Sequence, residues 1–353
     1  MRMKNLEKFW HGKKVLITGN TGFKGSWLSI WLHSMGATVT GYSLKPNTKP
    51  ALFYDSGLDK KYKTYYKDIR DSKALETTIH KSQPEIVFHL AAQPLVRDSY
   101  EDPLYTYETN VLGTANLLNA LRSSSSIKSI VIVTTDKCYQ NQEWDWGYRE
   151  TDALGGHDPY SSSKACAELV TQSFRDSYFS SLNIGLATAR AGNVIGGGDW
   201  THNRVVPDVL RAIASKSKLE LRNPKAIRPW QHVLEPIYGY LLLAQKLFNS
   251  PGKFSSAWNF GPNQEDARTV ISIANHLINK SDSKSKIVIK KSSLKETNIL
   301  KLDITKSFSQ LGWKPQLDID STLELIMRWN ESHQKGCDSF ALCLQDISRL
   351  SIR

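Results

Sequence analysis

Tyr160 and Lys164 are the residues of this sequence whose types and spacing first suggest chemistry. Pro159 suits the first turn of a helix, and Asp158 suits the capping position before it, so a helix is predicted to begin here. Residues four apart lie on one helical face, which places the phenol beside the ammonium. A neighbouring cation favours the phenolate, which serves as a base for a hydroxyl proton. The alternative is a surface pair without a catalytic role.

Three further reactive side chains follow a predicted buried strand at 127–133. Thr135, Asp136 and Lys137 offer a hydroxyl, an acid and an amine. In a doubly wound sheet the carboxyl ends of the strands face the ligand crevice, so these groups are expected to point toward whatever Tyr160 attacks. They are more proton-transferring groups than hydride transfer alone requires.

A strand at 13–18 leads into glycines at 19, 22 and 25 and then into an apolar-periodic helix. Strand, glycine loop and helix form the context of a dinucleotide-binding fingerprint. The glycines let the backbone turn tightly and approach a pyrophosphate, while the helix N-terminus supplies amide donors. The spacing is GxxGxxG and not GxGxxG, so a plain strand-helix turn is the alternative. A bound oxidised nicotinamide would add a second positive charge beside Tyr160.

The second predicted strand, 37–42, ends in Ser43-Leu44-Lys45, where a NAD-selective site often carries an acidic residue. NADP is therefore an alternative cofactor, because Lys45 would suit a 2′-phosphate. Asp68 is a candidate partner for the adenine amino group or, alternatively, the cap of a helix beginning near Ser72. His89 lies in the buried strand 85–93 and is expected to be a hydrogen-bonded core histidine and not a base.

Composition excludes several classes of protein. The 353 residues carry a formal net charge of +12, and much of the excess positive charge lies in the Lys/Ser-rich stretch 280–301. This stretch lacks the interleaved aromatic residues that stack on bases, and its composition predicts a solvated face or loop. We therefore expect no nucleic-acid partner. The sequence contains no run of about 18 apolar residues, so no membrane span is expected. Four cysteines without ligand spacing predict neither a metal site nor a disulfide framework. Together with a start lacking a secretory segment, they lead us to expect a cytoplasmic protein.

The second half of the chain is expected to hold the substrate. Arg228 and His232 flank a short aromatic segment, and a guanidinium is suited to a pyrophosphate. A surface salt bridge between Arg228 and Glu235 is the alternative. Helices are predicted at 205–214, 237–248 and 321–333, and strands at 218–222 and 258–261. The sequence predicts no element for the tail after Gly336.

The expected fold is α/β: a Rossmann-type doubly wound parallel sheet with a smaller C-terminal α/β domain, which the family resemblance described below implies is nucleotide-sugar-binding. We assign the NAD-binding domain to 1–190, with the chain recrossing into it around 231–255, and the second domain to 191–353. A predicted helix at 103–122 and the helix carrying Tyr160 offer apolar surface to a second subunit, with burial inside one chain as the alternative. A homodimer or homotetramer is expected.

These residues resemble the extended short-chain dehydrogenase/reductases, and within them the nucleotide-sugar 4,6-dehydratases, over nearly the whole chain. The shared features are the glycine loop, the Ala91-Ala92 strand end, Thr135 and the Tyr160/Lys164 pair. The more specific strings are 22–28, 136–139, 143–150, 190–200 and 228–233. Related dehydratases for dTDP-glucose or GDP-mannose typically carry Asp-Glu after the threonine. Asp136-Lys137 stands there in this chain, which is similar to the branch that acts on CDP-glucose.

The resemblance implies a lyase that forms CDP-4-dehydro-6-deoxyglucose from CDP-glucose with NAD, in deoxyhexose biosynthesis for surface polysaccharide such as the O-antigen of lipopolysaccharide. Tyr160 would take the proton of the carbon-4 hydroxyl, with Lys164 and Thr135 assisting. Lys137 would remove the carbon-5 proton while Asp136 protonates the departing carbon-6 hydroxyl, although a nearby acid opposes a neutral lysine. The implied cofactor residues are Gly19, Thr21, Gly22, Phe23, Lys24, Gly25, Ser43, Asp68, Ile69, Ala91, Ala92, Asn110, Tyr160 and Lys164. The implied substrate residues are Gln93, Arg97, Asn193, Arg204, Arg228 and His232; no metal is implied.

Three other functions are compatible with the scaffold. One is a dehydratase that acts on another nucleotide sugar. A nucleotide-sugar epimerase needs no acid and base for elimination, so Asp136 and Lys137 count against it. A binding module without turnover has no chemical need of Tyr160, Lys164 and Thr135 together.

Overall fold

A computed structural model describes residues 2–281, 283, 285–290 and 299–352. Its centre is a seven-stranded sheet in the order β10-β6-β5-β4-β1-β2-β3, in which every neighbouring pair is parallel. The strands are β1 (Lys14–Thr18), β2 (Thr38–Ser43), β3 (Thr64–Tyr66), β4 (Ile86–His89), β5 (Ser129–Val133), β6 (Gly185–Ala191) and β10 (Ala257–Phe260). Strand order reverses between β1 and β4, which is where a doubly wound sheet opens its ligand crevice. The predicted Rossmann-type α/β fold is confirmed.

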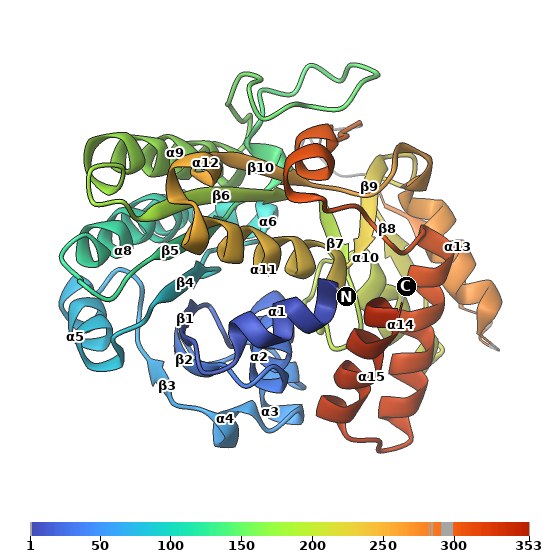
Figure 1. Cartoon of the computed structure of the whole chain (residues 1–353). Coiled ribbons are helices and arrows are strands. Elements are labelled where there is room, and N and C mark those ends of the chain that lie inside the picture. Colours follow the sequence, from blue (N-terminus) through green and yellow to red (C-terminus); the bar gives the residue numbers. More distant parts are fainter. Residues whose placement is uncertain (1, 282, 284, 291–298, 353) are drawn as a thin grey trace.

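Helices cover both faces of this sheet, as Figure 1 shows. Alternation along β1 explains why: Leu16 faces one apolar core, while Val15 and Ile17 face the other. The first core holds residues of α5 (Ser72–Ser82), α8 (Gly113–Leu121) and the strands. The second holds residues of α1 (Arg2–Trp10), α2 (Phe23–Ser34), α11 (Leu234–Asn249) and α12 (Pro251–Phe254). Parallel strands buried on both sides are therefore apolar almost throughout.

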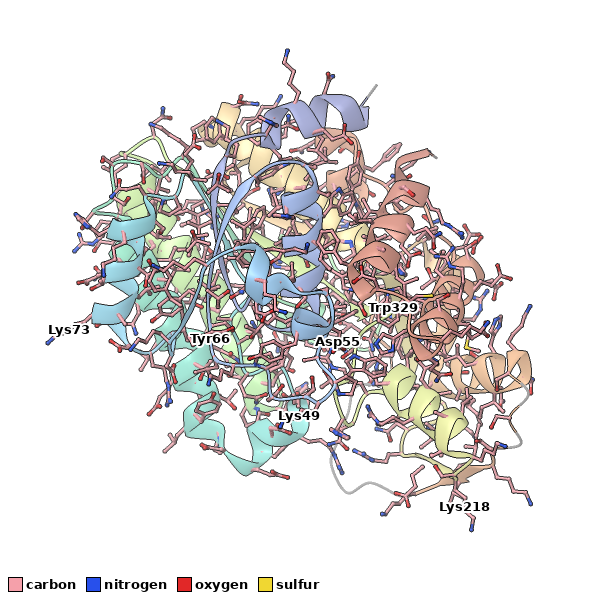
Figure 2. All side chains as sticks on the ribbon, turned by 90° about the horizontal axis from the view of Figure 1, so that it is seen from below. Lys49, Asp55, Tyr66, Lys73, Lys218 and Trp329 are labelled. Carbon is pink, nitrogen blue, oxygen red and sulfur yellow. The ribbon has the colours of Figure 1, made fainter. Side chains whose placement is uncertain are left out.

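The remaining elements of the second half surround a separate apolar core. They include α10 (Val205–Ser215), α13 (Val270–Lys280) and α14 (Ile319–Gln334). Two small sheets complete this part, one of β7 (Asn193–Ile195), β9 (Ile227–His232) and β11 (Ala267–Thr269), the other of β8 (Leu219–Leu221) and β12 (Ile287–Ile289). Part of the lysine-rich stretch 280–301 lies outside the described residues, but β12 within it pairs with β8. Figure 2 labels Lys73 on α5 and Lys218 before β8 at opposite ends of the molecule.

The chain returns to the large sheet after visiting the second part. Helix α11 packs against β5, and β10 adds a strand beside β6, so the returning segment extends past the predicted end at 255. The last helix, α15 (Ser339–Ile352), packs against α2. The tail after Gly336, for which the sequence predicted nothing, therefore packs against the part of the chain that forms the large sheet.

Short elements connect these parts, and π-helical turns occur at three places among the described residues. The short helices are α3 (Leu52–Asp55), α4 (Leu58–Lys61), α6 (Val96–Glu101), α7 (Pro103–Tyr107), η2 (Asp136–Cys138) and η4 (Gln264–Asp266). The π-helical turns are η1 (Glu108–Leu112), η3 (Arg175–Phe179) and η5 (Ser307–Leu311). The predicted helix 103–122 is thus α7, η1 and α8 in succession. Among the described residues, no helix combines the length and apolar content that a bilayer crossing needs.

Tryptophans join the two halves of the molecule. Trp27 on α2 donates from Nε1 to the carbonyl oxygen of Gly197 at 2.9 Å. A Cβ at Gly197 would lie 2.2 Å from the ring of Trp329, so only glycine fits beneath this indole. Trp329 stacks on His333, whose Nε2 lies 3.9 Å from Oδ2 of Asp55. Asp55 and Trp329, labelled in Figure 2, thereby link α3 to α14.

Candidate active site

Helix α9 (Pro159–Phe174) presents the tyrosine-lysine pair as the sequence predicted. The Asp158 carboxylate caps it by accepting from the amide of Ser161 at 2.9 Å. The amide of Tyr160 donates to Oγ of Ser99 at 3.1 Å, which fixes the first turn against α6. Tyr160 and Lys164 are both buried, so they are not a surface pair.

The pKa values of this pair differ from the expectation that the lysine activates the phenol. Burial lowers the pKa of Lys164 to about 8, although the Glu168 carboxylate opposes this shift. Lys164 Nζ donates to the carbonyl oxygen of Val133 at 3.5 Å. Burial raises the pKa of Tyr160 to about 12; its hydrogen bond with Thr135 lowers it, and the Asp136 carboxyl raises it further. In the protein alone the phenol therefore stays protonated, and a cation that enters with a ligand must supply the remaining activation.

Thr135, Asp136 and Lys137 follow β5 and enter the single turn η2. Oγ1 of Thr135 donates to Oδ1 of Asp136 at 3.0 Å and accepts from the Lys137 amide at 3.3 Å. Burial raises the pKa of Asp136, while Lys137, Thr135, Arg228 and Lys24 hold it down. Oδ2 of Asp136 is buried without a hydrogen-bond partner in the described structure. A buried carboxyl with one unpartnered oxygen is suited to act as a general acid toward a ligand.

A buried ion pair between Glu168 and Arg190 joins helix α9 to the large sheet. Oε2 of Glu168 accepts from Nη2 of Arg190 at 2.8 Å and from Oγ1 of Thr188 at 2.7 Å. Thr134 also donates to this carboxylate. Burial alone would raise the pKa of Glu168, but Arg190 and the two threonine hydroxyls bring it below its usual range. The network fixes α9 to β6 and to the end of β5.

A cavity of about 370 Å³ lies along the glycine loop, within the range of small-molecule sites. We call it the cofactor cavity. A Cβ at Gly19 would lie 2.6 Å from the amide nitrogen of Ala91, and one at Gly25 would lie 2.2 Å from the Gly19 carbonyl oxygen. These contacts leave backbone, and no side chain, at the start of α2, where amide groups bind a pyrophosphate. The residues present therefore fit a dinucleotide.

Nearly all residues that the sequence predicted for the cofactor line this cavity. They are Gly19, Thr21, Gly22, Phe23, Lys24, Gly25, Ser43, Asp68, Ile69, Ala91, Ala92, Tyr160 and Lys164. Asn110 is absent from the lining; it lies behind it, where Oδ1 accepts from the amide of Gln93 at 2.9 Å and Nδ2 donates to Oγ of Ser163 at 2.9 Å. Gln93 was predicted for the substrate but lines the cofactor cavity, with Nε2 donating to the Leu95 carbonyl oxygen at 2.9 Å.

The structure shows which residue caps α5 and what Ser43 contacts at the end of β2. The helix cap is Asp71, whose carboxylate accepts from the Ala74 amide at 3.0 Å, so the alternative cap at Asp68 is wrong. Asp68 instead pairs with Arg70 at 2.8 Å while facing the cavity. Ser43, at the end of β2, exchanges a hydrogen bond of 2.8 Å with Thr21.

A second cavity of about 320 Å³ adjoins the first and is called the sugar cavity. Its lining includes the predicted residues Arg97, Thr135, Asp136, Lys137, Tyr160, Asn193, Arg204 and Arg228. Arg228 and Glu235 are both buried, so the alternative of a salt bridge at the surface is wrong. The Glu235 carboxylate accepts the amides of Gln316 and Leu317, both at 2.8 Å.

The prediction of His232 as a substrate residue is wrong. Its side chain is completely buried, packs edge-on against Trp27 and accepts from the Leu234 amide at 3.3 Å. Burial first, and then Arg328, lower its pKa to about 3, so it is neutral. His89 is the core histidine that the sequence predicted, bonded through Nδ1 to Thr18 at 2.7 Å and through Nε2 to Thr114 at 3.1 Å.

Sequence reasoning missed the supporting residues Ser99 and Glu168. Ser99 lies 61 positions from its partner Tyr160, and no local pattern connects them. It also missed that Lys24 lines both cavities. Among the described residues, no group of three or more His, Cys, Asp or Glu side chains is placed to hold a metal ion.

Known proteins can be compared with this site and fold. The family model for GDP-mannose 4,6 dehydratase matches residues 16–326. CDP-glucose 4,6-dehydratase of Salmonella typhimurium is 48% identical over 348 residues, which cover 97% of this chain and 97% of that protein.

Solved structures share the fold at lower identity. An epimerase from Methanothermobacter thermautotrophicus is 22% identical with a TM-score of 0.81, over 94% of this chain and 96% of that one. A dTDP-glucose 4,6-dehydratase from Bacillus anthracis, solved in complex with NAD, is 21% identical with a TM-score of 0.76, over 92% and 98%. The solved structures share only the fold with this chain, whereas the family model and the Salmonella enzyme match its sequence over almost the whole length. The chain therefore belongs to the GDP-mannose 4,6-dehydratase family of nucleotide-sugar 4,6-dehydratases.

Proposed function

We propose that this chain is an NAD-dependent lyase that converts CDP-glucose to CDP-4-dehydro-6-deoxyglucose with loss of one water. The observation that carries the proposal is the meeting of a buried phenol, Tyr160, and a buried acid, Asp136, in one cavity that adjoins the glycine loop. The 48% identity to a CDP-glucose 4,6-dehydratase supports the choice of substrate.

The residues of the cofactor cavity would hold NAD, which would supply a hydride acceptor for carbon 4 of the hexose and a hydride donor for carbon 6. Tyr160 removes the carbon-4 hydroxyl proton, and its hydrogen bond with Thr135 lowers the cost of the phenolate. Lys164, held at the end of β5 by Val133, contributes a charge beside the phenol in the same cavity.

Elimination needs an acid and a base on the same hexose. Asp136 protonates the departing carbon-6 hydroxyl, because its burial favours the neutral form from which a proton is donated. Lys137, the next residue along the chain, lines the same cavity and takes the carbon-5 proton. An epimerase has no use for this acid.

The nucleotide part of the substrate extends away from Tyr160. Arg204 and Arg228 line the sugar cavity with Asn193 and Arg97, and guanidinium groups match pyrophosphate oxygens. Residues 220–223 also line the sugar cavity, and we assign the nucleotide base to this part of the lining. We therefore assign the NAD-binding role to 1–190 with the returning segment, and nucleotide-sugar binding mainly to 191–353.

A homodimer is part of the proposal. Leu104, Leu112 and Leu169 are 74%, 57% and 55% exposed, and they lie on α7, η1 and α9, which pack against one another. Apolar surface of this kind is stabilised by a second subunit. A homotetramer and a cytoplasmic location remain predictions of the sequence.

The test is to incubate the purified protein separately with CDP-glucose, dTDP-glucose, UDP-glucose and GDP-mannose, and to follow each by mass spectrometry. We expect CDP-glucose alone to yield a product lighter by one water, with NAD unchanged at the end. Water loss from another sugar in place of CDP-glucose contradicts the substrate, and an isomer of unchanged mass indicates an epimerase. No change in any sugar contradicts the proposed lyase.

A further inference from the structure

Lys24 occupies an unusual place between the two cavities. Four lysines among the described residues line the cofactor cavity: Lys24, Lys45, Lys67 and Lys164; Lys24 also lines the sugar cavity. Phe23 and Tyr160 share this double position with it. A hydride that passes from hexose to cofactor must cross where the cavities meet. The reactive end of the cofactor therefore belongs beside Lys24, and the adenosine end beside Ser43 and Ile69.

The charge of Lys24 lacks a fixed partner within the described structure, where it makes no hydrogen bond or ion pair. The charged groups that act on it are Arg204 and Lys164, which oppose its protonation, and Asp136, which favours it. Burial first, and then these two cations, lower the pKa of Lys24 to about 7, so the side chain is charged in part of the molecules at neutral pH. An ammonium held among cations is poised to interact with the charge of an incoming ligand.

The oxidised nicotinamide ring is a cation and the reduced ring is neutral. A second positive charge nearby in a site of low dielectric repels the oxidised ring and leaves the reduced ring nearly unaffected. We propose that Lys24 is a redox-tuning residue, which weakens binding of NAD⁺ relative to NADH and so favours the first oxidation of the sugar. Loss of its proton removes the bias, which suits a cycle that must later return the hydride.

This inference rests on NAD as the cofactor but not on CDP-glucose as the substrate. The test therefore uses no sugar: NADH binding is titrated by fluorescence and NAD⁺ binding by calorimetry on cofactor-free protein. In Lys24→Met we expect the ratio of the two dissociation constants, NAD⁺ over NADH, to fall about tenfold. For a two-electron couple a tenfold change equals about 30 mV in the potential of the bound cofactor.

Lys45→Met is the matched control, because Lys45 lines the adenosine end of the same cavity. It should change both dissociation constants by the same factor and leave the ratio within twofold of wild type. Lys24→Arg keeps a charge at every pH, so its ratio should stay high from pH 6 to about 9. The wild-type ratio should rise as pH falls through about 7, where Lys24 gains its proton.

A ratio in Lys24→Met within twofold of wild type overturns the proposal. So does a wild-type ratio that is independent of pH, a result that needs no variant to fold. Absence of NAD⁺ and NADH binding to wild type contradicts both this inference and the cofactor of the proposed function. If NAD⁺ and NADH both bind tightly and their ratio does not depend on the charge of residue 24, only this inference is contradicted and NAD remains the cofactor.

Discussion

Lys164 lies one turn after Tyr160 on α9, and its Nζ donates a hydrogen bond to the carbonyl oxygen of Val133 at 3.5 Å. The lysine thus anchors the catalytic helix to the end of β5 at the place where the two cavities meet. Burial acts on the two groups in opposite directions, lowering the pKa of Lys164 to about 8 and raising that of Tyr160 to about 12. The protein alone therefore holds the pair far from its reactive state, and ligands complete the site.

Tyr160→Phe should abolish water loss from CDP-glucose, by about 10³-fold or more, because the base for the carbon-4 hydroxyl is removed. Binding of NAD⁺ and of the sugar nucleotide, measured by calorimetry, should change less than about threefold, since the ring remains. Tyr240→Phe is the matched control: its hydroxyl is also buried and has no hydrogen-bond partner in the described structure. Near wild-type turnover in Tyr160→Phe contradicts the assigned base.

The free energy of unfolding should report the lowered pKa of Lys164. Folded protein releases this proton near pH 8 and unfolded chain near 10.5, so between these values the unfolded chain binds more protons and stability rises with pH. Lys164→Met lacks this contribution. Urea unfolding should show wild type gaining roughly 3 kcal/mol on the variant between pH 8 and 10.5. Parallel pH profiles for the two proteins would refute the shift.

Glu168→Gln should destabilise the fold by about 3–5 kcal/mol, because Arg190 is left buried without its counter-charge. The two side chains are 3% and 4% exposed, so water cannot replace the lost partner. Glu324→Gln is the control; its pair with Lys280 spans 3.9 Å with side chains 67% and 58% exposed, and its loss should cost under about 0.5 kcal/mol. Equal midpoints of urea unfolding for the two variants would contradict the importance of the buried pair.

Gly25→Ala should lower NAD⁺ affinity at least about tenfold and stability by about 1–3 kcal/mol, since its Cβ would lie 2.2 Å from a backbone oxygen. Gly252→Ala places its Cβ where nothing lies within 4 Å, and an alanine in helix α12 should be neutral or slightly stabilising. Calorimetric titration with NAD⁺ and thermal unfolding measure both effects. Unchanged NAD⁺ binding in Gly25→Ala would argue against a pyrophosphate at this loop.

Local rules explain what the sequence predicted well. A glycine loop after a β-branched strand, and a Pro preceded by an Asp, act within a few residues, so β1, α2 and α9 were located correctly. The residues of the cofactor cavity followed from the same context. The tryptophan strings indicated the family, and part of their physical role is to pack the two halves together, as Trp27 does at Gly197.

Other features depend on partners that are distant in the sequence. Helix α15 is stabilised by packing on α2, more than 300 positions away, so its own pattern was not informative. Asp68 and Asp71 offer equivalent caps, and only the geometry of α5 selects Asp71. His232 has the residue type of a ligand contact, but the fold turns it into the interior. Burial is the first cause of the lowered pKa of Lys24, and the charges of Arg204 and Lys164, on separate segments, lower it further against the opposing charge of Asp136.

Strand β10 has a consequence for any attempt to exchange parts between related enzymes. Because Ala257–Phe260 completes the edge beside β6, a gene fragment ending near residue 190 would encode a sheet whose outer strand is unprotected and prone to self-association. Chimeras that swap substrate preference should therefore retain the native return segment together with the nucleotide-binding half. Evolution of new sugar specificity on this scaffold is, by the same reasoning, easier through substitutions in place than through shuffling of whole modules.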